Sequence, residues 1–139
     1  MRDPLTDAPV GIQRIALEQR SGKIEKVDRM MLGRAGVVKL WPSGAQLAVG
    51  EGLETTLAAA TRVTYESAPL TPAWAALSTT GMRDLPIIPG VERLVLLVDN
   101  DANQKGQMAA GQAAVRNAGR TVVPLLPPVT GTDFNDMFM

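Results

Sequence analysis

Three acidic residues stand where apolar segments of this sequence end. Asp99 directly follows the apolar run 94–98, Asp101 stands two residues later, and Glu51 lies at the end of the apolar segment 46–52. Two like charges beside a buried segment repel each other, so leaving both ionised costs free energy. Clustered carboxylate oxygens suit Mg²⁺ or Mn²⁺, which take one or two carboxylates together with waters and substrate phosphates. The pattern therefore predicts a divalent-cation site.

The composition narrows the chemistry that this chain can perform. Its 139 residues include no Cys and no His, which excludes thiol nucleophiles, Ser-His-Asp triads and zinc sites of the usual kind. Any catalysis must use carboxylates, Lys, Arg, hydroxyl groups or a metal ion. Acidic and basic residues balance at 14 each, so a nucleic-acid partner would be held by a local patch rather than by a global positive field.

The order of segments predicts one main domain preceded by a short lead-in. Residues 1–45 indicate a small antiparallel segment, with a hairpin turn at Arg20–Lys23 and a strand at Gly36–Trp41. After the breaker Pro42–Gly44, short apolar strands alternate with helical segments, which is typical of βαβ units and a parallel sheet. We therefore place the main domain at residues 46–139.

The fold class that we expect is α/β, with a mainly parallel four-stranded sheet flanked by helices. Apolar residues throughout the segment 93–99 favour a strand covered on both faces. Pro124 favours a sheet edge for the last strand, and Gly119 favours the end of the second helix. The expected strands are 46–52, 73–81, 93–99 and 121–126, and the expected helices are 53–63 and 104–119.

The loops at the carboxyl ends of these strands should hold the functional residues, because ligands of open parallel sheets bind there. Glu51, Asp99 and Asp101 would meet at this edge. Thr80 and Gly81 could offer backbone N–H groups to a phosphate, although they could equally form an ordinary strand exit. Arg83 and Lys105, just beyond strand ends, are candidates for phosphate contacts, although exposed cations on such loops are mostly solubilising.

Structural roles compete with the metal-binding interpretation. An Asp-x-Asp sequence after an apolar strand is often a solvated loop in which the side chains form Asx turns or caps. Glu54 is better explained as an acidic residue in the first turn of a helix, where the helix dipole favours it. A pair of aspartates alone therefore does not establish a cation site.

The arrangement as a whole resembles the Toprim domain shared by primases, topoisomerases and some nucleases. The stretches "VGEGLETTLAA", "ALSTTGMRDL", "LVLLVDND", "GQMAAGQAA" and "DFND" are similar to the Toprim modules of plasmid- and phage-type primases, which are often fused to helicases. The resemblance covers residues 46–136. The earlier stretches "PVGIQRIAL" and "RMMLGRAGVVKLW" also resemble the segment that precedes this module.

The resemblance implies roles for four residues. Glu51 would act as general acid or base in nucleotidyl transfer or strand cleavage, or bind a second ion, while Asp99 and Asp101 would coordinate Mg²⁺. Asp133, in "TDFND", matches a late acidic motif near the metal. A cap for a final helix explains Asp133 equally well.

The function implied is that of the catalytic domain of a DNA primase or primase-helicase. It would join ribonucleotides into primers on a single-stranded DNA template with Mg²⁺ or Mn²⁺, together with a helicase domain or helicase partner. The first 11 residues have no apolar signal-peptide core, and no apolar run approaches the roughly 18 residues of a membrane span. We expect a cytoplasmic protein without membrane contact.

The chain resembles a fragment of a longer primase, and it has no Cys or His for the zinc module that such primases usually carry. An isolated fragment could therefore be poorly active or inactive. The alternatives are a Toprim nuclease, in which the same metal site activates water, and a non-catalytic Toprim module of a replication protein. Haloacid-dehalogenase-like phosphatases fit poorly, because Gln104 stands where their motif has Thr and too little chain follows Asp101.

Overall fold

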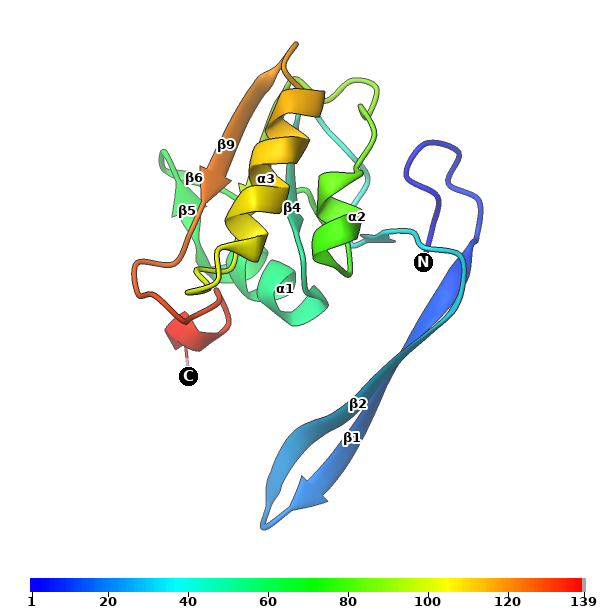
Figure 1. Cartoon of the computed structure of the whole chain (residues 1–139), viewed down its shortest axis with the longest axis vertical. Helices are drawn as coiled ribbons and strands as arrows, with labels where there is room; N and C mark the ends of the chain where they lie inside the picture. Colours follow the sequence, from blue (N-terminus) through cyan, green and yellow to red (C-terminus); the bar gives the residue numbers. More distant parts are fainter. Residues whose placement is uncertain (139) are drawn as a thin grey trace.

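The computed structural model describes residues 1–138. Its centre is a five-stranded sheet in the order β3-β7-β4-β8-β9, flanked by helices, with a separate β1–β2 hairpin extending from the body (Figure 1). The strands are β1 (Gly11–Arg20), β2 (Lys23–Gly33), β3 (Val38–Lys39), β4 (Gln46–Gly50), β5 (Thr64–Tyr65), β6 (Ala68–Pro69), β7 (Ala73–Ala75), β8 (Arg93–Leu97) and β9 (Thr121–Leu125). The helices are α1 (Leu53–Arg62), α2 (Thr79–Arg83), α3 (Lys105–Arg116) and the 3₁₀ turn η1 (Asp136–Phe138).

The sheet confirms the predicted fold class and adds one strand to it. The pairs β4–β7, β4–β8 and β8–β9 are parallel, and β9 with its Pro124 lies at an edge as expected. The fifth strand is β3, which pairs antiparallel with β7 at the other edge. Its residues fall in the segment that we assigned to the lead-in, because the sequence does not show which sheet a short apolar strand joins. The division of the chain at residue 45 stays a prediction.

The predicted strand 73–81 was too long. The strand β7 ends at Ala75, and the helix α2 begins at Thr79. Ser78 caps this helix, because its Oγ accepts a hydrogen bond from the backbone N–H of Gly81 at 2.9 Å. Ser followed by Thr-Thr is both a common strand ending and a good helix start, and the tertiary structure selects the helix.

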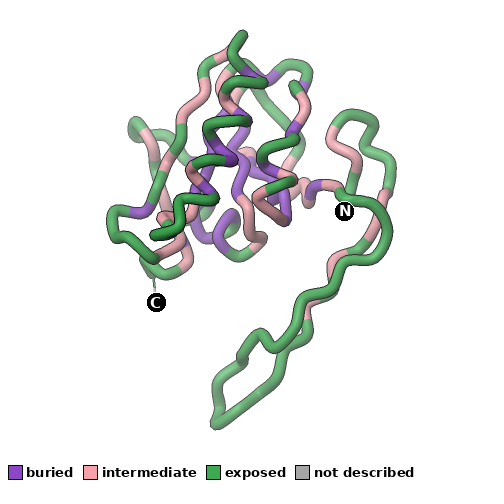
Figure 2. The backbone as a smooth tube through the Cα atoms, in the orientation of Figure 1, coloured by how far each residue is buried: buried purple, intermediate pink, exposed green. Residues whose placement is uncertain are grey.

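The core fills both faces of the sheet. One cluster lies between the sheet and the helices α2 and α3, and a second lies between the sheet and α1. Side chains of β8 alternate between them, with Leu94 and Leu96 in the first and Val95 and Leu97 in the second. The strand is therefore buried on both faces, as its uninterrupted apolar sequence predicts (Figure 2).

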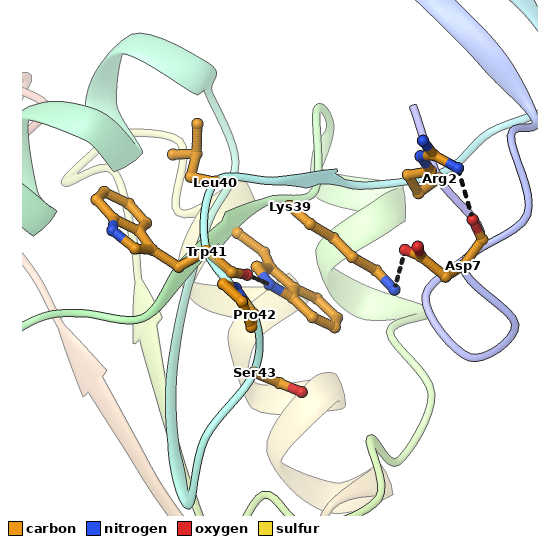
Figure 3. A pocket seen from close by; sticks show the side chains of 8 residues that line it. Arg2, Asp7, Lys39, Leu40, Trp41, Pro42 and Ser43 are labelled. Atoms are coloured by element: carbon orange, nitrogen blue, oxygen red, sulfur yellow. Dashed lines mark hydrogen bonds and ion pairs between the residues drawn. The ribbon is translucent and has the colours of Figure 1, made fainter.

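The pocket in Figure 3 lies beside β3 rather than at the carboxylates of the sheet's carboxyl edge, and has a volume of about 500 Å³. The two cationic side chains that line this pocket, Lys39 and Arg2, already bind other groups of the chain. Lys39 Nζ lies 2.9 Å from Asp7 Oδ1 and 4.6 Å from the centre of the Trp74 ring. Arg2 Nη1 donates to the carbonyl of Asp7 at 3.0 Å. These contacts tie the N-terminal loop to the sheet, so we assign the pocket a structural role.

The β1–β2 hairpin confirms the antiparallel segment predicted near the N-terminus. Its turn contains Ser21 and Gly22, both with positive φ (51° and 79°), as a two-residue hairpin loop requires. Among residues 1–138, no helix is long and apolar enough to cross a membrane.

Candidate metal centre

Adjacent parallel strands bring Glu51 and Asp99 to the same edge of the sheet. In the register of β4 with β8, Gly50 lies opposite Leu97. Glu51 follows β4 directly, and Asp99 follows β8 after one further residue. Asp101 lies in the same loop as Asp99 and is exposed. The structure thus places the three predicted residues at the carboxyl end of the sheet.

Two glycines allow the helices to approach these loops closely. A Cβ at Gly50 would clash with Oγ1 of Thr56, whose hydroxyl donates to the carbonyl of Gly52 at 2.6 Å. A Cβ at Gly106 would lie 3.3 Å from the carbonyl oxygen of Asp99. Without side chains at these positions, α1 can begin at Leu53, two residues after Glu51, and α3 can pack against the aspartate loop.

Among the described residues, no ion pair compensates the charge of the Asp99 carboxylate. The residue is half-buried, and its Oδ1 atom is buried without a hydrogen-bond partner among the described residues. Burial, followed by the negative charges of Glu51, Asp133, Asp101 and Asp136 in that order, raises the pKa of Asp99 to about 6. The ionised form of Asp99 is therefore under strain that a cation would relieve.

Glu51 is half-buried like Asp99, but more interactions favour its ionised form. Burial raises the pKa of Glu51, and the charge of Asp101 adds to the effect. A hydrogen bond from the backbone of Thr79 and the positive charge of Arg29 act in the opposite direction. The start of α2 and the strand β2 therefore both influence this carboxylate.

Asn100, which was not among the predicted site residues, holds the C-terminal turn beside the aspartate loop. Its backbone N–H donates to Thr132 (3.0 Å), its carbonyl accepts from Gly131 (2.6 Å), and its Nδ2 donates to Pro127 (2.9 Å). These three bonds bring the acidic motif near Asp99. Asn between two aspartates carries no signal for such tertiary contacts.

Asp133 lies near the centre but also caps the final turn. Its Oδ1 accepts from the backbone N–H groups of Asn135 (2.7 Å) and Asp136 (2.9 Å), and its Oδ2 accepts from Thr55 Oγ1 (2.8 Å). This is the capping role that we held open for it. A role in metal binding stays a prediction, supported by the effect of its charge on the pKa of Asp99.

Two further residues near the metal centre, Asp136 and Gln107, were not predicted from the sequence. The charge of Asp136, within the quoted "DFND", contributes to the raised pKa of Asp99. Gln107, on the first turn of α3, donates from Nε2 to the carbonyl of Asp101 at 3.4 Å, while its Oε1 is buried without a partner in the described chain. An isolated Gln in a helix gives no sequence signal for such a position.

The residues predicted to contact phosphate differ in how available they are to a ligand. Arg83 makes a two-point ion pair with Asp84, at 2.8 and 2.6 Å, and the N–H of Gly81 is taken by the cap of α2. Thr80 is exposed on that helix. Lys105 begins α3 next to the aspartate loop and is exposed. Phosphate binding by all four stays a prediction, with Lys105 the best placed.

The residues present fit a hard cation that keeps part of its own coordination shell. Within residues 1–138, no three acidic side chains are close enough to enclose a metal ion. Charge repulsion acts over longer distances than coordination, which explains why four carboxylates still raise the pKa of Asp99. Mg²⁺ suits such a site, because it uses one or two carboxylates plus waters and phosphates.

The comparison with protein families identifies the family of this chain. Residues 46–139 match the Toprim domain. The chain belongs to the Toprim family. Toprim domains occur in primases, topoisomerases and nucleases, usually act as metal-dependent enzymes, and in general bind Mg²⁺. No curated protein and no solved structure matches the chain significantly.

The raised pKa of Asp99 predicts how the stability of this Toprim domain depends on pH without metal. The folded pKa of about 6 lies above the 3.8 of an ordinary aspartate, so the folded state binds more protons than the unfolded state and loses stability as pH rises from about 4 to about 6. Asp99→Asn should remove this loss. Its advantage over wild type should grow through that window and reach on the order of 1 kcal/mol, kept small by solvent screening.

Chemical denaturation of both proteins in a chelator, at several pH values, measures this difference directly. The other carboxylates titrate in both proteins, so the difference isolates Asp99. A variant that is less stable than wild type at every pH would identify Asp99 as a structural hydrogen-bonding residue instead.

Proposed function

We propose that this Toprim domain is the catalytic domain of a DNA primase or primase-helicase. The observation that carries the proposal is the half-buried pair Glu51 and Asp99 just beyond the ends of neighbouring parallel strands, each with a raised pKa. Among Toprim enzymes, the sequence resemblance of residues 46–136 and of the preceding segment to plasmid- and phage-type primases favours a primase. The reaction is the joining of ribonucleotides on single-stranded DNA.

The acidic side chains have distinct roles in this proposal. Asp99 and Asp101 would hold Mg²⁺ or Mn²⁺, with the buried Oδ1 of Asp99 as one donor. When bound, the ion supplies stabilisation of negative charge on the attacking and leaving oxygens. Glu51 takes up a proton more readily than an ordinary glutamate, because burial raises its pKa. It is therefore suited to accept the proton of a primer 3′-hydroxyl.

The partners proposed are ribonucleotides, a single-stranded DNA template and a helicase domain or helicase subunit, within the cytoplasm. Because the whole chain has no net charge, template binding must rely on local cations. Lys105 is the first candidate, since it is exposed beside the aspartate loop and makes no ion pair among the described residues.

Primer synthesis by the full-length parent protein tests the proposal. Labelled ribonucleotides, single-stranded DNA and Mg²⁺ should yield short RNA products that depend on both template and metal. Metal-dependent cleavage of the DNA without incorporation would contradict the proposal and indicate a Toprim nuclease. Metal binding without either activity would indicate a non-catalytic module.

A further inference from the structure

The β1–β2 hairpin exposes several large apolar side chains to solvent. Neither outer edge pairs with another strand in the described chain, and both strands lie in solvent along most of their length (Figures 1 and 2). Two-stranded hairpins alone are marginally stable, and exposed apolar patches mark interaction sites. The exposed large apolar residues are Ile12, Leu17, Ile24, Val27, Met30, Met31 and Leu32.

The outer edges of β1 and β2 differ in how well they can accept a further strand. On β2, Val27 is an extra residue between Lys26, opposite Leu17, and Asp28, opposite Ala16. Such a bulge disrupts an edge. Lys26 is also tied to the body by an ion pair with Glu54 at 3.0 Å. The strand β1 has no bulge of its own, so its edge is the one free to accept another strand.

The sequence of β1 is complementary to itself when two copies run antiparallel around Ala16. In that register Arg14 lies opposite Glu18, Ile15 opposite Leu17, and Gln13 opposite Gln19 of the second copy. Each pair occurs twice because the arrangement has twofold symmetry. A shift that centres the pairing on Leu17 would place Arg14 opposite Arg20. One register is therefore favoured.

We propose that β1 pairs with β1 of a second copy of this chain and forms a four-stranded antiparallel sheet around Ala16. The pairing satisfies the free backbone groups of both edges and covers Ile15 and Leu17. Arg14 makes no ion pair in the described chain, and Glu18 binds Arg20 through Oε2 alone, which leaves Oε1 for Arg14 of the second copy.

A protein partner explains the hairpin better than a nucleic acid does. Basic residues of the hairpin alternate with Glu18, Glu25 and Asp28, so neither strand carries a continuous positive stripe. The apolar residues between these charges have no role in phosphate contacts. Binding of single-stranded DNA by the hairpin of a monomer is the competing outcome.

Sedimentation equilibrium of the 139-residue chain over a wide concentration range tests the proposal. Wild type should show a monomer–dimer equilibrium. Arg14→Glu and Glu18→Arg should each weaken dimerisation at least about tenfold, because both symmetry-related pairs change from attractive to repulsive. An equimolar mixture of the two variants should recover a dimer, because each substituted side chain then faces an opposite charge.

Two matched variants control for net charge. Arg34→Glu and Glu92→Arg make the same charge changes at exposed positions outside the segment 13–19 that pairs around Ala16 and should dimerise as wild type does. Circular dichroism of every variant reports whether it is folded. The proposal is overturned by a wild-type monomer at all concentrations, by dimers indifferent to Arg14→Glu, or by a mixture that stays monomeric, including the case in which the monomer binds single-stranded DNA.

Discussion

Replacing Glu51 with Gln should lower primer synthesis by the parent protein at least about a hundredfold, the smallest contribution usual for a general acid or base. The amide keeps the shape of the side chain but cannot take up a proton. Single-stranded DNA binding should change little, because phosphate and base contacts elsewhere supply the affinity. Initial rates of ribonucleotide incorporation and a DNA-binding titration under the same salt conditions measure the two quantities.

Glu54→Gln is the matched control for this experiment. Glu54 lies three residues further along the chain, is exposed, and pairs with Lys26 instead of facing the aspartates. Its amide variant should retain nearly all of the synthesis. Equal losses in both variants would show that charge near α1 matters in general, and normal synthesis by Glu51→Gln would remove the catalytic role of Glu51.

The edge of the sheet at which the carboxylates lie could be predicted because it depends only on the parallel direction of the strands. An uninterrupted apolar run requires a strand buried on both faces, and parallel neighbours end at the same edge. Glu51 directly follows one such strand and Asp99 lies two residues after the end of the other, so their convergence needs no knowledge of the loops. The raised pKa of Asp99 follows from the same placement.

Features that depend on tertiary contacts could not be predicted. The helix α2 replaces the end of an expected strand because Ser78 caps it, although its residues suit both structures. Asn100 holds the C-terminal turn through three hydrogen bonds to distant residues. The extension of the β1–β2 hairpin into solvent could not be predicted either. An alternating apolar pattern does not show whether the rest of the domain packs against those side chains.

Mn²⁺ should stabilise the folded Toprim domain, and most of this gain should disappear in Asp99→Asn. An ion that binds only the folded state adds about 2.7 kcal/mol at a hundredfold excess over its dissociation constant. Mn²⁺ is the better probe, because Mg²⁺ without nucleotide can bind too weakly to detect. Thermal unfolding of both proteins with and without Mn²⁺, at fixed ionic strength, measures the effect.

An Asp→Asn substitution at another position serves as the control. It distinguishes Mn²⁺ binding at Asp99 from a general attraction of cations to the protein. Asp28→Asn removes one negative charge from the exposed hairpin, and its stabilisation by Mn²⁺ should match that of wild type. A similar loss in both variants would indicate a diffuse attraction of cations to the protein.

The central claim is that Asp99 binds a divalent cation at the carboxyl edge of the sheet. Electron paramagnetic resonance of free Mn²⁺ during a titration at neutral pH tests it most directly. The result we predict is a saturable site in wild type whose dissociation constant rises at least about tenfold in Asp99→Asn, equivalent to the loss of about 1.4 kcal/mol. Equal Mn²⁺ binding by wild type and Asp99→Asn would contradict the claim.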